Sequence, residues 1–318
     1  MKSFCDIIDL TLMSFKSNVF EEQMQMQGGI RLDFTFITPD TEKELKAQLS
    51  DRGSFLMAGG TDLLVKVRIG KIKPRKVIST LKVSTLHFLE DKTDELVIGA
   101  TITHSELMKF KPLTRDFPIL HDAIFTIGSA QIRNRGTLVG NIVNASPAGD
   151  GLLALYLLNA KVEFSDGSII PIEEFVIGPG QTTLPAGEYV RAIHIPKDKW
   201  DIHYFEKVGQ RNSMTISVAS VGWLIKCKNG VMFSSERGGR TIEEFRIAYG
   251  SVAPTVLRLR DVEEFAKGKH IDEEFVHSIS EMVKKDVHPI DDVRGSAEYR
   301  KTLCANLVYR MIEEEVKC

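Results

Sequence analysis

The stretch from Gly128 to Gly149 constrains this chain most, because it is rich in Gly, Asn and Ser and has little periodicity. Loops of that length are uncommon inside compact domains, and those that occur often carry a binding site. The motifs QIRNRGTLVGNI (131–142) and SPAGD (146–150) combine hydroxyl, amide and carboxylate side chains with glycines, which leave the backbone accessible. Such groups can bind a ribose, a diphosphate or a heterocycle edge. The alternative is a surface loop whose Asn and Thr side chains satisfy its own backbone.

A second glycine-rich turn lies earlier, where MAGGTDLL occupies positions 57–64 between a predicted strand and a predicted helix. Paired glycines allow a backbone to approach a ligand closely, and the first amides of a helix attract anions. A pyrophosphate would fit there, with the Thr61 hydroxyl as a further donor. A turn of this type can equally be a tight connection, so this turn alone does not decide the question.

The chain around these loops alternates between short strands and helices. Thr38 followed by Pro39 indicates a helix start, as do Thr61 and Asp62 after the paired glycines. The predicted strands cover 34–37, 54–58, 76–81, 96–100, 161–164 and 168–172, and the predicted helices cover 38 to Gly53, 61 onward, 103–108, 117–127 and 152–158. Asp166-Gly167 between two of these strands is typical of a hairpin.

The last third changes to an antiparallel meander followed by helices. Strands are predicted at 217–227, 231–234 and 245–250, with a turn at Asn229-Gly230, and helices at 261–267, 272–285 and 296–316. Strands followed by helices suggest a separate α+β domain. We therefore expect a C-terminal domain over 212–318, a preceding domain over 31–211, and an N-terminal extension over 1–30 without an assigned role.

Bulk properties exclude several classes of protein. The net charge of −2 gives no support to a nucleic-acid partner. The four cysteines are scattered and form no CxxC pair, whereas iron–sulfur and zinc sites need clustered thiolates. We therefore expect no metal in this chain and reduced thiols in the cytoplasm. No run approaches the ~20 apolar residues of a membrane span, and residues 1–30 do not resemble a signal peptide.

Signatures of other catalytic classes are missing as well. The sequence contains no GxxxxGKS or GxxxxGKT and no complete GxGxxG, since Gly178-Pro179-Gly180 lacks a third glycine. Its histidines show no metal-ligand spacing, and no nucleophile–base pair presents itself. We therefore name no catalytic residue. Two nucleotide-like loops without such a constellation suit a bound redox cofactor, which supplies the chemistry itself.

In combination, AGGTDLL and GSAQIRNRGTLVGNIVNASPAGD resemble the FAD-binding medium subunit of molybdenum hydroxylases, which include xanthine, nicotinate and carbon monoxide dehydrogenases. The motif DVRGSAEYR at 292–300 is typical of that family's last domain. The resemblance runs from about Asp33 to the C-terminus. It implies an α+β fold: a PCMH-type FAD-binding domain of two α+β subdomains, and a C-terminal α+β domain of an antiparallel sheet with helices.

The resemblance also implies how FAD would be held without a covalent bond. The first turn would cradle the pyrophosphate, Thr137 and its neighbours would complete that cradle, and Asp150 would hold a cofactor hydroxyl. Ile127 stands where some relatives have an aromatic residue against the adenine, and residues 209–215 match a mobile loop near the flavin. In LVG (138–140), Val139 stands where a second glycine is commoner. The implied cofactor-binding residues are Ala58, Gly59, Gly60, Thr61, Asp62, Leu63, Leu64, Ile127, Thr137, Gly140, Asn141, Asp150, Leu184 and Lys207.

In this family a large subunit with a molybdenum cofactor hydroxylates the substrate, and a small subunit with two 2Fe-2S clusters carries the electrons to FAD. The resemblance implies that this chain is an oxidoreductase subunit, which passes those electrons through FAD to an acceptor such as NAD+. One alternative is a self-sufficient PCMH-fold flavin reductase or oxidase, and another is a nucleotide-binding scaffold without enzymatic activity. The match of the last third to the family's C-terminal domain favours the subunit.

Overall fold

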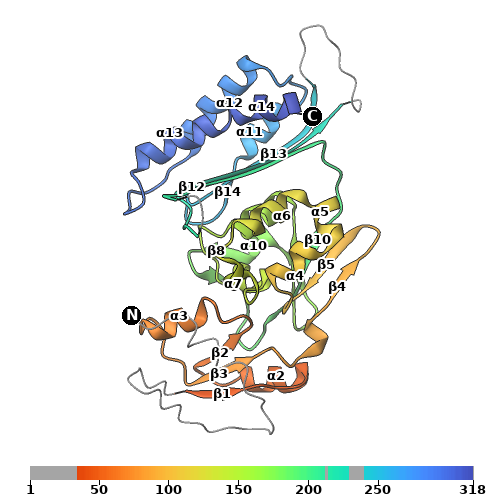
Figure 1. Ribbon diagram of the computed structural model, residues 1–318, viewed down its shortest axis with the longest axis vertical. Coiled ribbons are helices and arrows are strands. Elements are labelled where there is room, and N and C mark those ends of the chain that lie inside the picture. Colours follow the sequence, from red (N-terminus) through yellow and green to blue (C-terminus); the bar gives the residue numbers. More distant parts are fainter. Residues whose placement is uncertain (1–33, 212–213, 229–239, 318) are drawn as a thin grey trace.

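The computed structural model describes residues 34–211, 214–228 and 240–317, which form three tiers along the longest axis (Figure 1). The lower tier is a parallel sheet in the order β1-β3-β2, the middle tier an antiparallel sheet in the order β4-β5-β10-β6-β7, and the upper tier an antiparallel sheet in the order β11-β12-β13-β14. Helices cover these sheets, and β8 pairs with β9. The predicted α+β class is confirmed.

The lower tier contains the first glycine-rich turn. Its elements are β1 (Thr35–Ile37), α2 (Glu42–Leu49), β2 (Ser54–Met57), α3 (Leu63–Arg68) and β3 (Lys76–Ser79). The predicted helix start at Thr38 is wrong, because Thr41 caps α2 and its hydroxyl accepts a hydrogen bond from Glu44 N at 3.2 Å. The turn itself connects β2 to α3, as predicted.

The middle tier contains the long glycine-rich segment. Its elements are η2 (Ser84–Leu86), β4 (Leu89–Asp91), β5 (Glu95–Gly99), α4 (His104–Lys109), α5 (Lys111–Asp116), α6 (Pro118–Phe125), α7 (Ala130–Arg133), α8 (Leu138–Val143), α9 (Asp150–Leu157), β6 (Lys161–Phe164), β7 (Ile169–Pro171), α10 (Ile172–Phe175), β8 (Val176–Gly178), β9 (Gln181–Thr182) and β10 (Val190–Pro196). The predicted hairpin at Asp166-Gly167 is the β6–β7 connection.

The expectation of an irregular loop from 128 to 149 is wrong, because the segment contains the two short helices α7 and α8. Thr137 caps α8, and its hydroxyl accepts a hydrogen bond from Gly140 N at 2.9 Å. Leu138 and Ile142, four residues apart on one helix face, are fully buried in the main core. Tertiary burial therefore makes a helix from a sequence whose glycine and asparagine content favours a loop.

The upper tier begins at β11 (Ile202–Val208), ahead of residue 212. It continues with β12 (Ala219–Cys227), β13 (Ile242–Gly250), β14 (Leu257–Arg258), α11 (Arg260–Ala266), α12 (Glu273–Asp286), α13 (Ala297–Leu307) and α14 (Arg310–Lys317). The predicted single helix at 296–316 is two helices, and the predicted strand at 231–234 with its turn at 229–230 lies outside the described residues. The division into domains at residues 30 and 211 stays a prediction.

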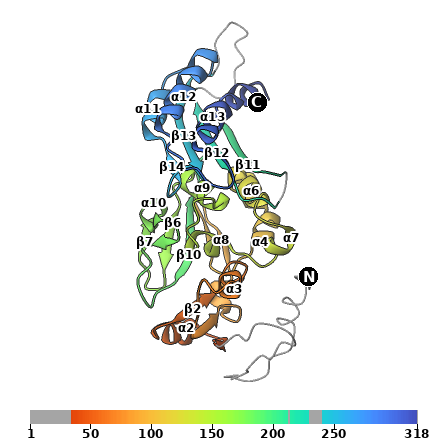
Figure 2. The ribbon, with the colours of Figure 1, turned by 90° about the vertical axis from the view of Figure 1, so that its left-hand side faces the viewer.

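The upper sheet is buried on both faces, which joins it firmly to the middle tier. Along β12, Trp223 and Ile225 pack with α11–α13, whereas Leu224 points into the main core. A β-carbon at Gly222 would lie 2.8 Å from Leu153 of α9, so that helix packs directly beneath the sheet (Figure 2). The upper tier thus holds α9, whose first residue is Asp150.

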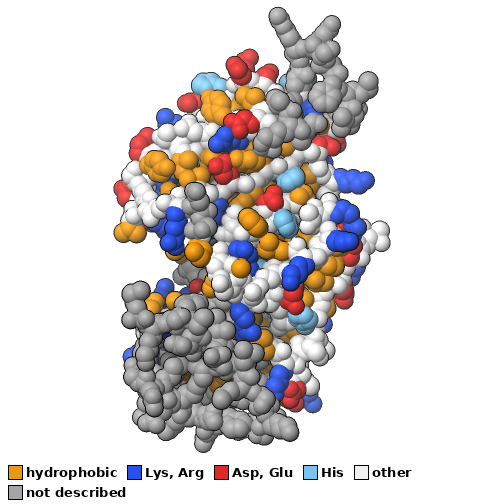
Figure 3. Space-filling model, viewed as in Figure 1, with side chains coloured by type: hydrophobic (Ala, Val, Ile, Leu, Met, Phe, Trp, Pro, Cys, Tyr) orange, Lys and Arg blue, Asp and Glu red, His pale blue; other side chains and the backbone are white. Residues whose placement is uncertain are grey.

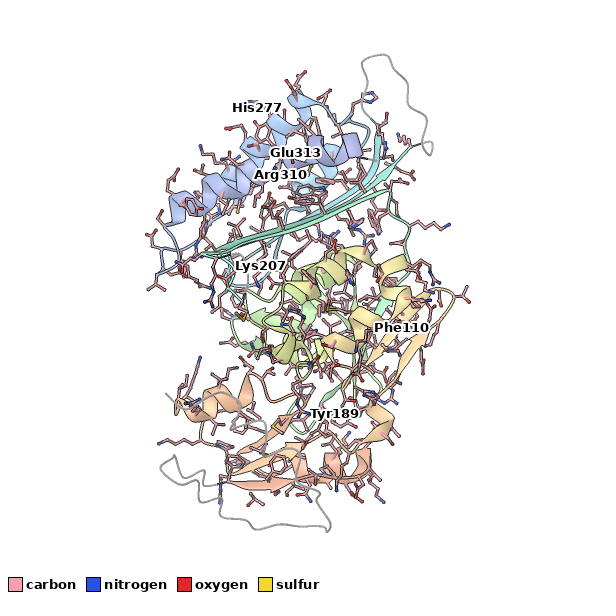
Figure 4. The ribbon with its side chains drawn as sticks, in the orientation of Figure 1. Phe110, Tyr189, Lys207, His277, Arg310 and Glu313 are labelled. Carbon is pink, nitrogen blue, oxygen red and sulfur yellow. The ribbon has the colours of Figure 1, made fainter. Side chains whose placement is uncertain are left out.

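The lower and middle tiers are also connected at a distance from the glycine-rich loops. Tyr189 lies at their boundary (Figure 4), and its hydroxyl donates a hydrogen bond to Glu42 of α2 at 2.6 Å. Lys46 of the same helix lies 2.8 Å from Glu188. These contacts restrict the movement of the lower tier, and with it the position of the first glycine-rich turn.

The surface charges and the helices concern two classes of protein, nucleic-acid binders and membrane-spanning proteins. Acidic and basic side chains intermingle over the described upper and middle tiers of the face in Figure 3, which shows no single-sign field of the kind that nucleic-acid binders carry. Among helices of the described residues, none combines the length and apolar character needed to cross a bilayer.

Candidate cofactor site

The two glycine-rich loops meet in direct contact. A β-carbon at Gly59 would lie 1.9 Å from the carbonyl oxygen of Arg135 and 2.9 Å from the amide nitrogen of Gly136. One at Gly136 would lie 3.5 Å from Thr61 Oγ1. We call this contact, between Gly59–Thr61 and Arg135–Gly136, the loop joint. It requires glycine at position 59, because two backbones cannot approach so closely with a side chain between them.

Contacts on either side hold the loop joint in place. Gly60 turns the chain with φ of +74°, in the left-handed region that favours glycine. Lys66 of α3 donates a hydrogen bond to Asn144 Oδ1 at 2.5 Å and lies 2.7 Å from Asp62. It therefore connects the helix after the first turn to the end of α8, so the two loops are held as one unit.

His104 lies beneath the loop joint. Its backbone N–H donates a hydrogen bond to the Gly136 carbonyl at 2.9 Å, and its Cδ2 lies 3.3 Å from the position of a Gly136 β-carbon. The side chain is buried, and its Nδ1 has no hydrogen-bond partner. Burial, with a smaller effect of the Arg133 charge, lowers the pKa of His104 to about 4. The imidazole supporting the loop joint is therefore neutral near pH 7.

This neutral histidine predicts a loss of stability in acid. An exposed histidine, as in the unfolded chain, titrates at 6.5, whereas His104 in the folded chain titrates at about 4. Between these values the unfolded chain binds the extra proton, so stability falls as the pH falls from 6.5 to 4. The histidine accounts for up to about 3 kcal/mol of this loss. Urea unfolding across this range should show that His104→Gln loses correspondingly less stability than wild type. Parallel curves for the two proteins would contradict the prediction.

A cavity of about 470 Å³ adjoins the loop joint, which is within the size range of small-ligand sites. Its wall joins parts of all three tiers. The lining residues are Asp62, Ile127, Gly128, Ser129, Ile132, Asn141, Ser146, Ala148, Asp150, Lys207, Met214, Thr215 and Ile216. Arg133 holds one part of this wall, because its guanidinium donates hydrogen bonds to the carbonyls of Ile127 at 3.0 Å and Gly128 at 3.2 Å.

A buried ion pair lies where the upper sheet meets the middle tier. Lys207 Nζ of β11 lies 2.6 Å from Asp150 Oδ2 at the start of α9, and it also donates to the Thr126 carbonyl at 3.1 Å (Figure 4). The two side chains are 8% and 4% exposed. Burial raises the pKa of Asp150, and the Lys207 ammonium opposes that rise. Neither charge would be stable here without the other.

The polar atoms of the cavity fit a ligand that carries hydroxyl groups. Asp150 Oδ1 and Asn141 Oδ1 are buried acceptors without a hydrogen-bond partner, and buried polar groups normally have one. The ribityl and ribose hydroxyls of FAD are suitable donors. Ile127, Ile132 and Met214 add apolar surface of the kind that a heterocycle packs against. The residues present therefore fit this cofactor.

The structure divides the predicted site residues into three groups. Asp62, Ile127, Asn141, Asp150 and Lys207 line the cavity. Others belong to the loop joint or support it: Gly59, Gly60, Thr61, Thr137 and Gly140, together with Ala58, Leu63 and Leu64 on either side of the first turn. Leu184 packs against the main core and is not among the lining residues. The roles of all these residues in binding stay predictions.

Several lining residues were not among the predicted site residues. Ser129 caps α7, and its hydroxyl accepts a hydrogen bond from Ile132 N at 3.3 Å. Ser followed by a short helical stretch is a capping signal that could have indicated α7. Ile216, which also lines the cavity, lies between β11 and β12 and carries no such signal. In the described part of the chain, no group of three His, Cys, Asp or Glu residues could hold a metal ion.

Two models of known protein families match this chain. Residues 32–198, more than half of the chain, match the model of the FAD binding domain in molybdopterin dehydrogenase. Residues 203–315 match the CO dehydrogenase flavoprotein C-terminal domain. Both glycine-rich loops and the cavity-lining residues up to Asp150 lie in the first match, and Lys207 lies in the second.

The matches to similar curated proteins extend over almost the whole length of those proteins. The glyceraldehyde dehydrogenase medium chain of Sulfolobus acidocaldarius is 28% identical over 89% of this chain and 98% of its own. The nicotine 6-hydroxylase medium subunit of Paenarthrobacter nicotinovorans is 29% identical, over 83% and 90%. The xanthine dehydrogenase FAD-binding subunit of Escherichia coli O157:H7 is also 29% identical, over 82% and 88%.

Solved structures show the same fold. A chain of carbon monoxide dehydrogenase from Hydrogenophaga pseudoflava superimposes with a TM-score of 0.81 at 24% identity, over 89% of this chain and 97% of that one. A chain of quinoline 2-oxidoreductase from Pseudomonas putida 86 gives 0.81 at 23%, over the same shares. At these identities the likeness establishes the arrangement of the three tiers and nothing finer.

Proposed function

This chain belongs to the family of FAD-binding flavoproteins of molybdopterin dehydrogenases, and from that premise we propose that it is the electron-transfer subunit of a heteromeric molybdenum hydroxylase. The observation that carries the proposal is the loop joint, with the cavity beside it. Bound FAD exchanges one or two electrons, so it can connect a one-electron donor to a two-electron acceptor. No catalytic residue of this chain is needed for that exchange.

Each part of the site has a proposed role in holding FAD. The loop joint receives the diphosphate on backbone amides of Gly59–Thr61 and of the α8 start, where Thr137 lies. Asp150 and Asn141 accept hydrogen bonds from cofactor hydroxyls. Lys207, paired with Asp150, brings a buried ammonium to the cavity wall and keeps the Asp150 carboxylate ionised as an acceptor. Ile127 supplies an aliphatic surface for the adenine.

The relatives' names support a proposal for the partners. The relatives are medium chains and an FAD-binding subunit, so we propose a large subunit with the molybdenum cofactor and a small subunit with two 2Fe-2S clusters. NAD+ is the proposed acceptor, and the cytoplasm the proposed location. The domain division at residues 30 and 211 completes the proposal.

Two measurements test this function. The purified chain should bind FAD reversibly, with release on denaturation, and it should hydroxylate no substrate alone. When the chain is co-expressed with the proposed large and small subunits, it should co-purify with them. Substrate added to that complex without oxygen should bleach the flavin absorbance, and NAD+ should restore it. An active single chain would instead support a self-sufficient flavin reductase or oxidase. Nucleotide binding without flavin reduction would support a scaffold.

A further inference from the structure

The C-terminal motif DVRGSAEYR at 292–300 has no part in the site described so far. Its Arg300 is among the largest fully buried side chains and is 1% exposed. The guanidinium donates a hydrogen bond to the Ser251 carbonyl at 2.9 Å and pairs with the Asp292 carboxylate. Arg294 also pairs with Asp292, at 3.0 Å through Nε. A buried charge with two fixed partners indicates a position that must be held accurately.

From Arg300 the contacts lead to one wall of the cavity. Ser251 has φ of +65°, which is uncommon for a residue other than glycine and costs about 1 kcal/mol or more. Its N–H donates a hydrogen bond to the Pro147 carbonyl at 2.8 Å. The neighbours of Pro147, Ser146 and Ala148, line the cavity. Arg300 therefore holds Ser251 in the conformation that fixes this wall.

The same motif also contacts a second part of the cavity wall. The Val293 carbonyl accepts a hydrogen bond from Gln210 Nε2 at 3.4 Å. A β-carbon at Gly295 would lie 3.5 Å from Val218 Cγ1. Between Gln210 and Val218 lie Met214, Thr215 and Ile216, which line the cavity. One short segment thus reaches both walls, although it is distant from either in sequence.

We propose that Asp292 and Arg300 are positioning residues that set the separation of the two cavity walls, and so the affinity for the cofactor. The pair, together with Ser251, is called the C-terminal clamp. The inference rests on the proposed function only in taking FAD as the ligand. Arginine suits this position because two nitrogens of its planar fork donate in a fixed geometry, Nη1 to the Ser251 carbonyl and Nη2 to Asp292, and lysine has only one nitrogen for both partners.

The test uses Arg300→Lys and Asp292→Asn in the full chain. We expect each to raise the dissociation constant for FAD by about tenfold or more, because loss of supporting contacts typically lowers the affinity of a preorganised site on that scale. The visible circular dichroism of the bound flavin should change as well. The control is Ser280→Ala, which removes a buried hydrogen bond to the Ala305 carbonyl at 3.0 Å in the same tier. It should lower the melting temperature and leave FAD affinity unchanged.

A measurement made without the cofactor tests the clamp separately from the proposed function. Hydrogen exchange of the FAD-free chain should become faster at 146–149 and at 214–218 in the clamp variants, and stay at the wild-type rate there in Ser280→Ala. Unchanged exchange at both walls, or wild-type FAD affinity in both clamp variants, would overturn the clamp. If the wild-type chain failed to bind FAD, the proposed function would be overturned instead. The hydrogen-exchange rates of the FAD-free variants would still show whether the clamp holds the two walls. Should Arg300→Lys not fold, Asp292→Asn and Gln210→Ala carry the same comparison.

Discussion

The chain with alanine in place of Gly59 should bind FAD about a thousandfold more weakly than wild type, which corresponds to about 4 kcal/mol. The added β-carbon would lie 1.9 Å from the Arg135 carbonyl oxygen. That atom belongs to a backbone, so no side-chain rotation can relieve the overlap, and the loop joint has to open. The amides that we propose for the diphosphate would then face apart. Titration of the FAD-free protein, followed by flavin fluorescence, measures the effect.

Gly178→Ala is the matched control for this variant. A β-carbon there would approach only the side chain of Gln181, at 3.3 Å, and φ of Gly178 is not in the left-handed region. The control should therefore bind FAD as the wild type does. If Gly59→Ala also bound FAD with wild-type affinity, the loop joint would have no part in cofactor binding, whatever the protein's stability.

The second large effect concerns stability. Replacing Lys207 with methionine should lower the free energy of unfolding at pH 7 by about 3–5 kcal/mol, because it leaves the Asp150 carboxylate buried without its partner. The pKa of Asp150 is already raised by burial, and removal of the ammonium raises it further. Below that raised pKa the carboxyl is neutral, so the loss should shrink as the pH falls. Urea unfolding at several pH values measures both effects.

A double variant provides the control. Lys207→Met combined with Asp150→Asn removes both charges, so it should recover much of the lost stability, since a buried pair is costly to break and often cheap to replace. A single variant within about 1 kcal/mol of wild type at pH 7 would contradict the account of a buried, interdependent pair. So would a double variant no more stable than the single one.

The sequence predicted most of the fold where local signals are strong. The hairpin at Asp166-Gly167, the helix predicted at 103–108 and the strand before the paired glycines are all present. The helix start at Thr38 was wrong because several polar residues compete there for the cap. α8 was missed because its burial depends on contacts with α9 and the main core, which composition does not reveal. α7 buries no residue, and only its cap at Ser129 could have indicated it.

The site was predictable only in part, for a similar reason. Glycine at position 59 signals a close backbone approach, and the structure shows which backbone approaches it. The Lys207–Asp150 pair joins residues 57 positions apart in the chain, so no local pattern indicates it. The contact of Arg300 with Ser251, and of Ser251 with Pro147, likewise depends on how the upper tier packs on the middle tier. Resemblance drew attention to the motif at 292–300 but not to these contacts.

The most direct test of the central claim is a crystal structure of the chain with FAD bound. The diphosphate should lie at the loop joint, within hydrogen-bond distance of backbone amides from both Gly59–Thr61 and 136–141, with cofactor hydroxyls on Asp150 or Asn141. A diphosphate bound by only one of the two loops, or a cofactor outside the cavity that Lys207 lines, would contradict the claim.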